Sequence, residues 1–212
     1  MAALEEQWLV DIVIEENLLP NEYFTAFDEL GIWQLEKLKD FGLKPDERIL
    51  DVGCGCMRFG VFAVPFLDNG NYFGVDAFEP FLRMSNKLAE HYGLEKEYHL
   101  HYSRDFDFEH FGVKFDWAIA QSVFTHLSDY EIECCLEALK KVMKPKGKFL
   151  FTYLWGHPQT LGFLYSGKQL MSRPASLERG PLADLGTRYG ATYEELDIVH
   201  PTGQRVGLFT FD

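Results

Sequence analysis

Short apolar runs alternate with longer amphipathic segments along most of the chain. The short runs predict buried strands, whereas apolar positions spaced three and four apart predict helices. The predicted strands are Arg48–Val52, Tyr72–Asp76, Tyr98–Tyr102, Phe115–Gln121 and Gly147–Tyr153. Predicted helices between them cover residues 57–68, the segment from Glu79 to Gly93, and Ser128–Met143.

Local signals mark where two of these helices begin and end. Glu79-Pro80 places proline in a first helical turn, and Gly93 stands just past the expected end. Ser128-Asp-Tyr-Glu131 has the spacing of a capping box, and Pro145 stops the segment that follows it. Strands separated by such helices predict an α/β fold with a parallel sheet covered on both faces.

The two ends of the chain follow other patterns. Apolar positions in residues 3–16, and again from Phe24 to Phe41, predict a helical cap over residues 1–45. Residues 155–190 are rich in Gly, Pro, Ser and Arg, and we expect a substrate-side insertion there. The segments Tyr193–Val199 and Arg205–Phe211 flank a turn-like link and predict an antiparallel hairpin over residues 191–212. We therefore expect one domain, residues 1–212, with its core in residues 46–154.

The loop after the first predicted strand carries the clearest chemical signal. It reads Asp51-Val-Gly53-Cys54-Gly55-Cys-Met-Arg58, and its glycines allow a ligand to approach the backbone closely. The second predicted strand ends in Asp76, a carboxylate that can accept hydrogen bonds from two ribose hydroxyls. Because ligands of such sheets bind at the carboxyl ends of the strands, these residues predict a nucleoside site.

Two kinds of cofactor share this signal. A dinucleotide site has a third glycine where Arg58 stands, so that pyrophosphate can meet the helix N-terminus. Asp51 is an unfavourable neighbour for pyrophosphate, but it suits the ammonium group of a methionine moiety. The spacing favours S-adenosylmethionine over NAD.

Four segments together resemble the motifs of class I S-adenosylmethionine-dependent methyltransferases. They are Ile49–Gly55, Gly74–Asp76, Phe115–Leu127 and Leu139–Leu150, and the resemblance covers roughly residues 45–154. It implies a Rossmann-like, seven-stranded, mostly parallel sheet whose last strand is antiparallel. It also implies transfer of a methyl group to an N, O or other nucleophile of a small molecule.

The resemblance assigns roles to individual residues. Asp51, Gly53 and Gly55 would surround the methionine part, with Cys54 contributing its backbone amide and Arg58 as a further candidate contact. Asp76 would hold the ribose, and the adenine would lie beside Ala77, Phe78 and Asp105, although no Gly-Asp pair occurs at Asp105. Gln121 and Ser122 would line the cofactor after the fourth predicted strand.

Two histidines are candidates for removing a proton from the acceptor. His126 follows the fourth predicted strand and His157 follows the fifth, and neutral imidazole suits general-base work near neutral pH. Each also has an ordinary interpretation, as a residue fixing a helix entry or a loop. No cluster of acidic residues indicates a metal-dependent site.

Composition narrows the partners and the compartment. The formal net charge of −13 argues against nucleic acid, which usually binds a basic face. We expect no membrane partner, a cytoplasmic location with four reduced cysteines, and an oligomeric state that the sequence leaves open. Two alternatives stay open: an NAD-dependent oxidoreductase, and a non-catalytic module that binds S-adenosylmethionine.

Overall fold

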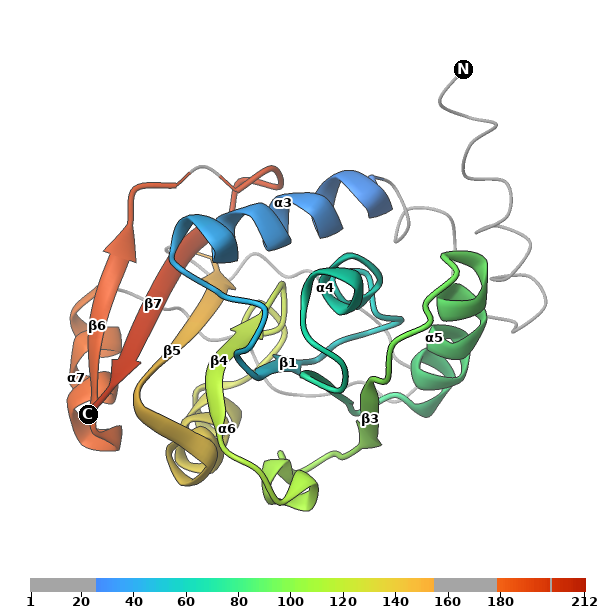
Figure 1. Cartoon of the computed structure of the whole chain (residues 1–212). Coiled ribbons are helices and arrows are strands. Elements are labelled where there is room, and N and C mark those ends of the chain that lie inside the picture. The colour runs from blue at the N-terminus through green and yellow to red at the C-terminus, as the bar shows by residue number, and fades with distance from the viewer. Residues whose placement is uncertain (1–25, 155–178, 199) are drawn as a thin grey trace, which may run out of the picture. The chain divides into compact units, whose positions relative to one another are not determined.

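Seven strands form the sheet of the computed structural model, which describes residues 26–154, 179–198 and 200–212 (Figure 1). Their order in the sheet is β3-β2-β1-β4-β5-β7-β6. The strands are β1 (Ile49–Val52), β2 (Tyr72–Asp76), β3 (His99–Tyr102), β4 (Phe115–Ala120), β5 (Met143–Tyr153), β6 (Ala191–Leu196) and β7 (Arg205–Phe211). β7 runs antiparallel to both of its neighbours, so the Rossmann-like α/β fold with a C-terminal hairpin is confirmed.

The helices follow the expected alternation. They are α3 (Phe27–Asp40), α4 (Gly60–Phe66), α5 (Glu79–His91), α6 (Asp129–Val142) and α7 (Arg179–Tyr189), with a 3₁₀ turn η2 at Phe108–Phe111. The capping box of α6 is confirmed, because the Glu131 amide donates to the Ser128 hydroxyl and the Ser128 amide donates to the Glu131 carboxylate. Gly93, with φ +63°, follows the end of α5 as expected.

Two helix or strand starts and one whole helix differ most from the expectation, and β6 spans Ala191–Leu196 rather than Tyr193–Val199. α4 begins at Gly60 rather than residue 57, because Met57 has φ +65° and belongs to the preceding turn. β5 begins at Met143 rather than Gly147, directly after α6, and its pairing with β4 shifts register near its start. α7 forms in the segment 155–190, where no helix is predicted. The predicted helix at residues 3–16 lies outside the described residues.

The described residues divide into two compact units. One unit comprises residues 26–47 and 54–104 and carries α3, α4, β2, α5 and β3. In it α3 packs closely on α4: a Cβ added to Gly31 would lie 2.4 Å from the Arg58 carbonyl oxygen and 2.6 Å from the Phe62 ring. Phe27 is buried and stacks on Tyr92, so it is part of this unit's core.

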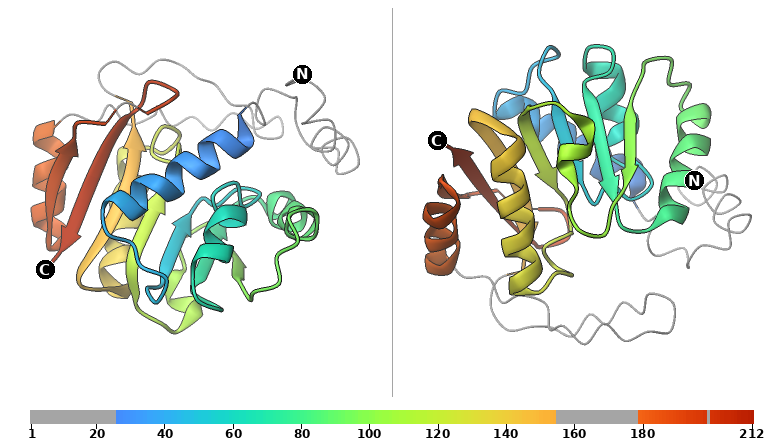
Figure 2. Two further views of the ribbon diagram at one scale, coloured as in Figure 1. Left: turned by 45° about the horizontal axis from the view of Figure 1, so that its top comes forward. Right: turned by 90° about the horizontal axis from the view of Figure 1, so that it is seen from below.

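The other unit carries β1, β4, β5, β7 and β6. Figure 2 shows α6 and α7 on the same face of its strands. Buried aromatic side chains fill this face, with Phe151 stacked on Phe209 at a ring-centroid distance of 5.1 Å. α7 packs there through Gly186, where an added Cβ would meet the Phe209 ring at 2.9 Å. None of the helices in the described ranges combines the length and the apolar character that a membrane crossing needs.

Candidate cofactor-binding site

Asp76, the last residue of β2, ties the glycine loop to that strand. One carboxylate oxygen accepts the Gly55 amide and the other accepts the Phe78 amide, both at 2.8 Å. A carboxylate offers about four lone-pair positions, so these two bonds leave acceptor capacity on both oxygens. Asp76 therefore orders the loop and can still accept hydrogen bonds from two vicinal hydroxyls.

Burial affects the acidity of this carboxyl group. Desolvation raises the pKa of Asp76, and the backbone amides of Phe78, Gly55 and Ala77 oppose part of that rise because they stabilise the ionised form. The ionised form that accepts hydrogen bonds is thus lost at a higher pH than for an exposed aspartate.

The loop after β1 is bonded to β2 through its backbone amides. The Cys54 amide donates to the Val75 carbonyl at 3.0 Å, and the Cys54 side chain packs on β2, where an added Cβ at Gly74 would lie 2.9 Å from its sulfur. Gly55 has φ +56°, a conformation that favours glycine. Burial raises the pKa of the Cys56 thiol to about 12, so the thiol stays protonated. Both cysteine side chains are buried, at 6% and 1% exposure, so they contribute to packing.

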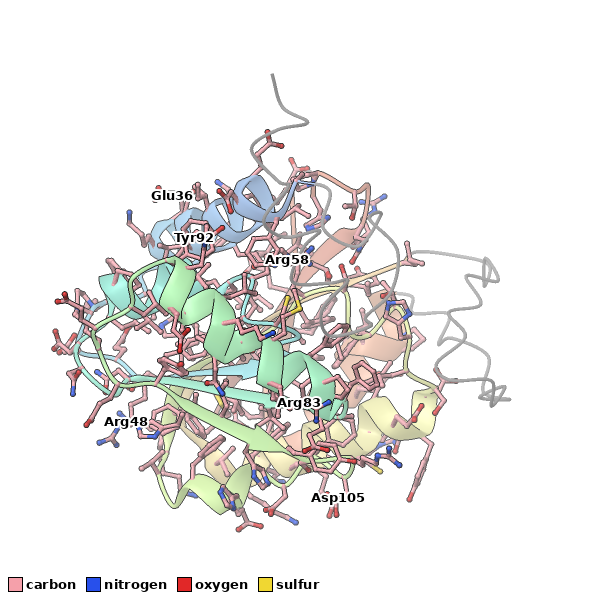
Figure 3. The ribbon with its side chains drawn as sticks, turned by 90° about the vertical axis from the view of Figure 1, so that its right-hand side faces the viewer. Glu36, Arg48, Arg58, Arg83, Tyr92 and Asp105 are labelled. Atoms are coloured by element: carbon pink, nitrogen blue, oxygen red, sulfur yellow. The ribbon has the colours of Figure 1, made fainter. Side chains whose placement is uncertain are left out.

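Arg58 follows this turn and is half-buried, and Figure 3 shows it near α3.

The candidate adenine contacts follow β2. Ala77 is exposed and Phe78 is half-buried, with its ring 5.0 Å from that of Phe81. An exposed small residue beside a partly exposed ring suits the face of a planar base. Asp105 is exposed, and its place beside adenine stays a prediction.

The unit with β1 and β4 brings the other candidate residues to one edge. β1, β4 and β5 are parallel, so the residues that follow them lie at the same edge. Asp51, near the end of β1, is buried at 3% exposure. A Cβ added to Gly53 would lie 2.5 Å from Val123 Cγ2, so the end of β1 meets the residues after β4 closely.

Ser122 is held in an unusual conformation at that edge. Its φ is +56°, which a residue with a side chain seldom adopts. Its amide donates to the buried Thr152 hydroxyl at 2.7 Å, and its carbonyl accepts the Thr125 hydroxyl at 2.9 Å. Such a locally disfavoured backbone persists because its surroundings fix it, and it is often associated with function.

Of the two candidate bases, only His126 lies among the described residues. His126 is exposed just before α6, and desolvation by neighbouring protein atoms lowers the pKa of its imidazole. It therefore stays neutral, and able to accept a proton, to a lower pH than an ordinary histidine. His157 lies outside the described residues.

Three polar residues near this edge were missed by the sequence analysis. They are Thr152 at the end of β5, and His200 and Gln204 in the link between β6 and β7; His200 is buried at 1% exposure. The register could have indicated them, because β7 runs antiparallel to β5 and Arg205 pairs with Tyr153. This pairing brings the 200–204 turn to the edge where β5 ends.

Comparisons with solved structures agree on the architecture. An S-adenosylmethionine-dependent methyltransferase from Clostridium acetobutylicum is 14% identical, with a TM-score of 0.66, and the match covers 100% of this chain and 99% of that one. Magnesium protoporphyrin IX methyltransferase from Synechocystis, solved with bound SAH, is 14% identical, with a TM-score of 0.63 and coverage of 90% and 83%. DesVI from Streptomyces venezuelae is 14% identical, with a TM-score of 0.64 and coverage of 88% and 92%.

At these identities the likeness shows the fold, and the family follows from a separate match. A family model described as a methyltransferase domain matches residues 43–187, which include the glycine loop, Asp76 and the residues after β4. This match agrees with the resemblance noted in the sequence and favours it over the dinucleotide alternative. The chain belongs to this methyltransferase domain family.

Proposed function

We propose that the protein is an S-adenosylmethionine-dependent methyltransferase that methylates a small molecule. The observation that carries this proposal is the arrangement of Asp76, which orders the glycine loop through Gly55 and keeps acceptor capacity for ribose hydroxyls. A dinucleotide site would need glycine where Arg58 stands.

The donor groups fit the charges of S-adenosylmethionine. Asp76 would accept the two ribose hydroxyls, and Asp51 would neutralise the ammonium group of the methionine part. Ala77, Phe78 and Asp105 would contact adenine, while Gly53, Cys54, Gly55 and Arg58 would surround the methionine part, with Gln121 and Ser122 beside them. When bound, the cofactor supplies an electrophilic methyl group on a sulfonium. The protein's task is to align an acceptor nucleophile with it and to exclude water.

The acceptor side of the proposal rests on the net charge and on His126. A net charge of −13 supports a small molecule over nucleic acid, and the similar structures named above include a protein named for a small-molecule substrate. His126 is our candidate for removing the acceptor's proton, since its lowered pKa keeps it neutral near pH 7. His157 is kept as a second candidate from its position in the sequence.

The proposal also covers the cellular location and the binding partners. The four cysteines, at positions 54, 56, 134 and 135, are thiols rather than disulfides, which supports a reducing, cytoplasmic location. We propose no nucleic-acid or membrane partner.

Two measurements test the proposal. Calorimetry compares binding of S-adenosylmethionine, S-adenosylhomocysteine and NAD; we expect the first two to bind and NAD not to bind. The purified protein is then incubated with methyl-labelled S-adenosylmethionine and a metabolite extract, and labelled products are identified by mass. Tight binding of NAD alone would overturn the cofactor assignment. Cofactor binding with no labelled product from any extract would favour the non-catalytic alternative.

A further inference from the structure

His200 lies in the link between β6 and β7, and the Gln121 side chain meets it within the same compact unit. His200 is buried at 1% exposure, and its Nε2 is hydrogen-bonded to the side-chain amide of Gln121, directly after β4. The two residues are 79 positions apart in the chain. A buried imidazole needs partners for both nitrogens, so its contacts show which nitrogen carries the proton.

The turn determines the protonation of the ring. The Thr202 amide donates to His200 Nδ1 at 3.1 Å, so Nδ1 carries no hydrogen. The Thr202 hydroxyl lies 2.7 Å from the same nitrogen. Because Nδ1 carries no hydrogen, the hydroxyl is the donor in this contact, and its oxygen accepts the Gln204 amide at 2.9 Å. A ring that accepts at Nδ1 is neutral and carries its proton on Nε2, the nitrogen that faces Gln121.

This protonation also determines how the Gln121 amide must lie. Gln121 Nε2 is placed against His200 Nε2, but two N–H donors cannot bond to each other. The amide is therefore assigned the opposite orientation, in which its oxygen accepts the hydrogen of His200 Nε2. Its NH₂ group then points away from His200. Gln121 is half-buried, so those two donor hydrogens lie at a partly open position on the edge where β4 ends.

Gln204 attaches the same turn to the neighbouring residue. Its amide nitrogen donates to the Ser122 hydroxyl at 2.8 Å, in addition to its bond with Thr202. The 200–204 turn is therefore bonded to both residues that follow β4, and Ser122 is fixed from its other side by Thr152. These bonds hold the turn against the end of β4, although Gln204 Oε1 is buried without a hydrogen-bond partner among the described residues.

We propose that His200 is a positioning residue whose Nε2–H fixes the Gln121 amide so that its NH₂ group donates to the bound methyl donor. This inference rests on the proposed function, since it assigns Gln121 to S-adenosylmethionine. In this proposal His200, buried at 1% exposure, acts through Gln121 and not directly on the cofactor. The 200–204 turn thus acts through Gln121 and Ser122.

Two substitutions separate positioning from a purely structural role. In His200→Asn, the amide oxygen replaces Nδ1 and keeps the bonds to Thr202, but nothing reaches Gln121. In His200→Gln, the amide nitrogen replaces Nε2 and keeps the donor to Gln121, but the bonds to Thr202 are lost. Pro201→Ala, at an exposed position of the same turn, is the control.

Calorimetry with S-adenosylhomocysteine measures the consequence. We expect His200→Asn to weaken binding about tenfold, the scale of one lost hydrogen bond, and His200→Gln to stay within about threefold of wild type. Gln121→Ala should weaken binding as His200→Asn does, and the double variant should be no weaker than Gln121→Ala alone. A turn with a purely structural role gives the reverse order, with His200→Gln weaker than His200→Asn, and would overturn the proposal.

Nitrogen NMR of histidine-labelled wild-type protein tests the geometry without any cofactor. We expect the His200 ring to be neutral with its proton on Nε2, and a proton on Nδ1 contradicts the inference. If the ring has the expected form but the wild type binds neither S-adenosylmethionine nor S-adenosylhomocysteine, the proposed function is wrong. In that outcome the His200–Gln121 bond stands and the role of Gln121 in cofactor binding does not.

Discussion

Asp76 serves both the fold and the proposed chemistry, because its carboxylate accepts two loop amides and has lone pairs left for ribose. In Asp76→Asn, one oxygen becomes an NH₂ group that faces a backbone N–H. We expect affinity for S-adenosylmethionine to fall roughly 10- to 100-fold, which corresponds to about 1.5–3 kcal/mol for hydrogen bonds to a charged group. Calorimetry measures the change, with the exposed Asp68→Asn as a control. Unchanged affinity in Asp76→Asn would contradict the ribose assignment.

The pH dependence of this affinity follows from the direction of the pKa shift. Desolvation raises the pKa of Asp76, so acidification protonates it earlier than an exposed aspartate and weakens cofactor binding. The effect of pH on folding stability runs in the opposite direction: acidification weakens cofactor binding but increases the contribution of Asp76 to the free energy of unfolding. Because the folded pKa is raised, the group's contribution to the free energy of unfolding is full below the unfolded pKa and is lost as pH rises through the folded pKa.

His126 provides a second prediction for a single residue. If it is the general base, His126→Ala should lower kcat about 10²- to 10⁴-fold and leave cofactor affinity nearly unchanged. Because its pKa is lowered, wild-type activity should persist below about pH 6.5, where an ordinary histidine is protonated. A pH–rate profile of both proteins checks this, with the exposed His91→Ala as a control. A variant with full activity would leave His126 as a residue at the entry to α6.

Residues that end predicted strands could be identified from the sequence, whereas residues that depend on strand register could not. Asp76 ends β2 and was predicted because an acid at that position, after a glycine loop, has a known physical use. His200 lies in a turn whose sequence resembles many other turns. Its role depends on the pairing of Tyr153 with Arg205, which is a property of the folded sheet.

At the scale of elements, the close packing of α3 on α4 depends on Gly31. In Gly31→Ala the new Cβ would meet the Arg58 carbonyl oxygen at 2.4 Å, and a backbone atom cannot move aside as a flexible side chain can. Overpacking costs about 1–3 kcal/mol, and better helix propensity returns about 1 kcal/mol. We expect a net loss of up to about 2 kcal/mol in the free energy of unfolding, measured by denaturant unfolding.

A matched control lies on the opposite, exposed face of the same helix. Glu36→Ala, at a residue labelled on α3 in Figure 3, should change the unfolding free energy by no more than about 0.5 kcal/mol. Gly31→Ala should also weaken cofactor binding, since Arg58 belongs to the glycine loop. If Gly31→Ala stabilised the protein, the interface between α3 and α4 would be less tightly packed than the structure shows.

Elements with strong local signals were predicted, and those formed by tertiary packing were not. α6 has a capping box and a run of apolar positions, and its sequence specifies its start. α7 contains Pro181 and Gly186, both poor helix formers, and it packs on Phe209 through the glycine that weakens its local signal. α4 starts later than predicted because Met57 has φ +65°, a backbone conformation that the apolar pattern of the sequence does not reveal.

At the scale of the whole molecule, the sheet order and the family match both agree with the methyltransferase fold expected from the sequence. Four motifs were predicted in order along the chain, and the family match spans them. Residues 155–178, which lie outside the described part, belong to the segment predicted to face the acceptor. A test of the cofactor that does not require the acceptor is therefore the most direct one.

Ligand-dependent unfolding provides such a test. A ligand that binds only the folded state at 100 times its Kd stabilises that state by about 2.7 kcal/mol. For a chain of 212 residues, 1 kcal/mol corresponds to roughly 2–4 °C, so S-adenosylmethionine should raise Tm by roughly 5–11 °C. Asp76→Asn at the same concentration should show a clearly smaller rise, because a larger fraction of the variant stays unliganded. Wild-type protein should show no rise with NAD. Equal rises in wild type and Asp76→Asn would mean that the cofactor binds without this carboxylate, and the site would have to be reassigned.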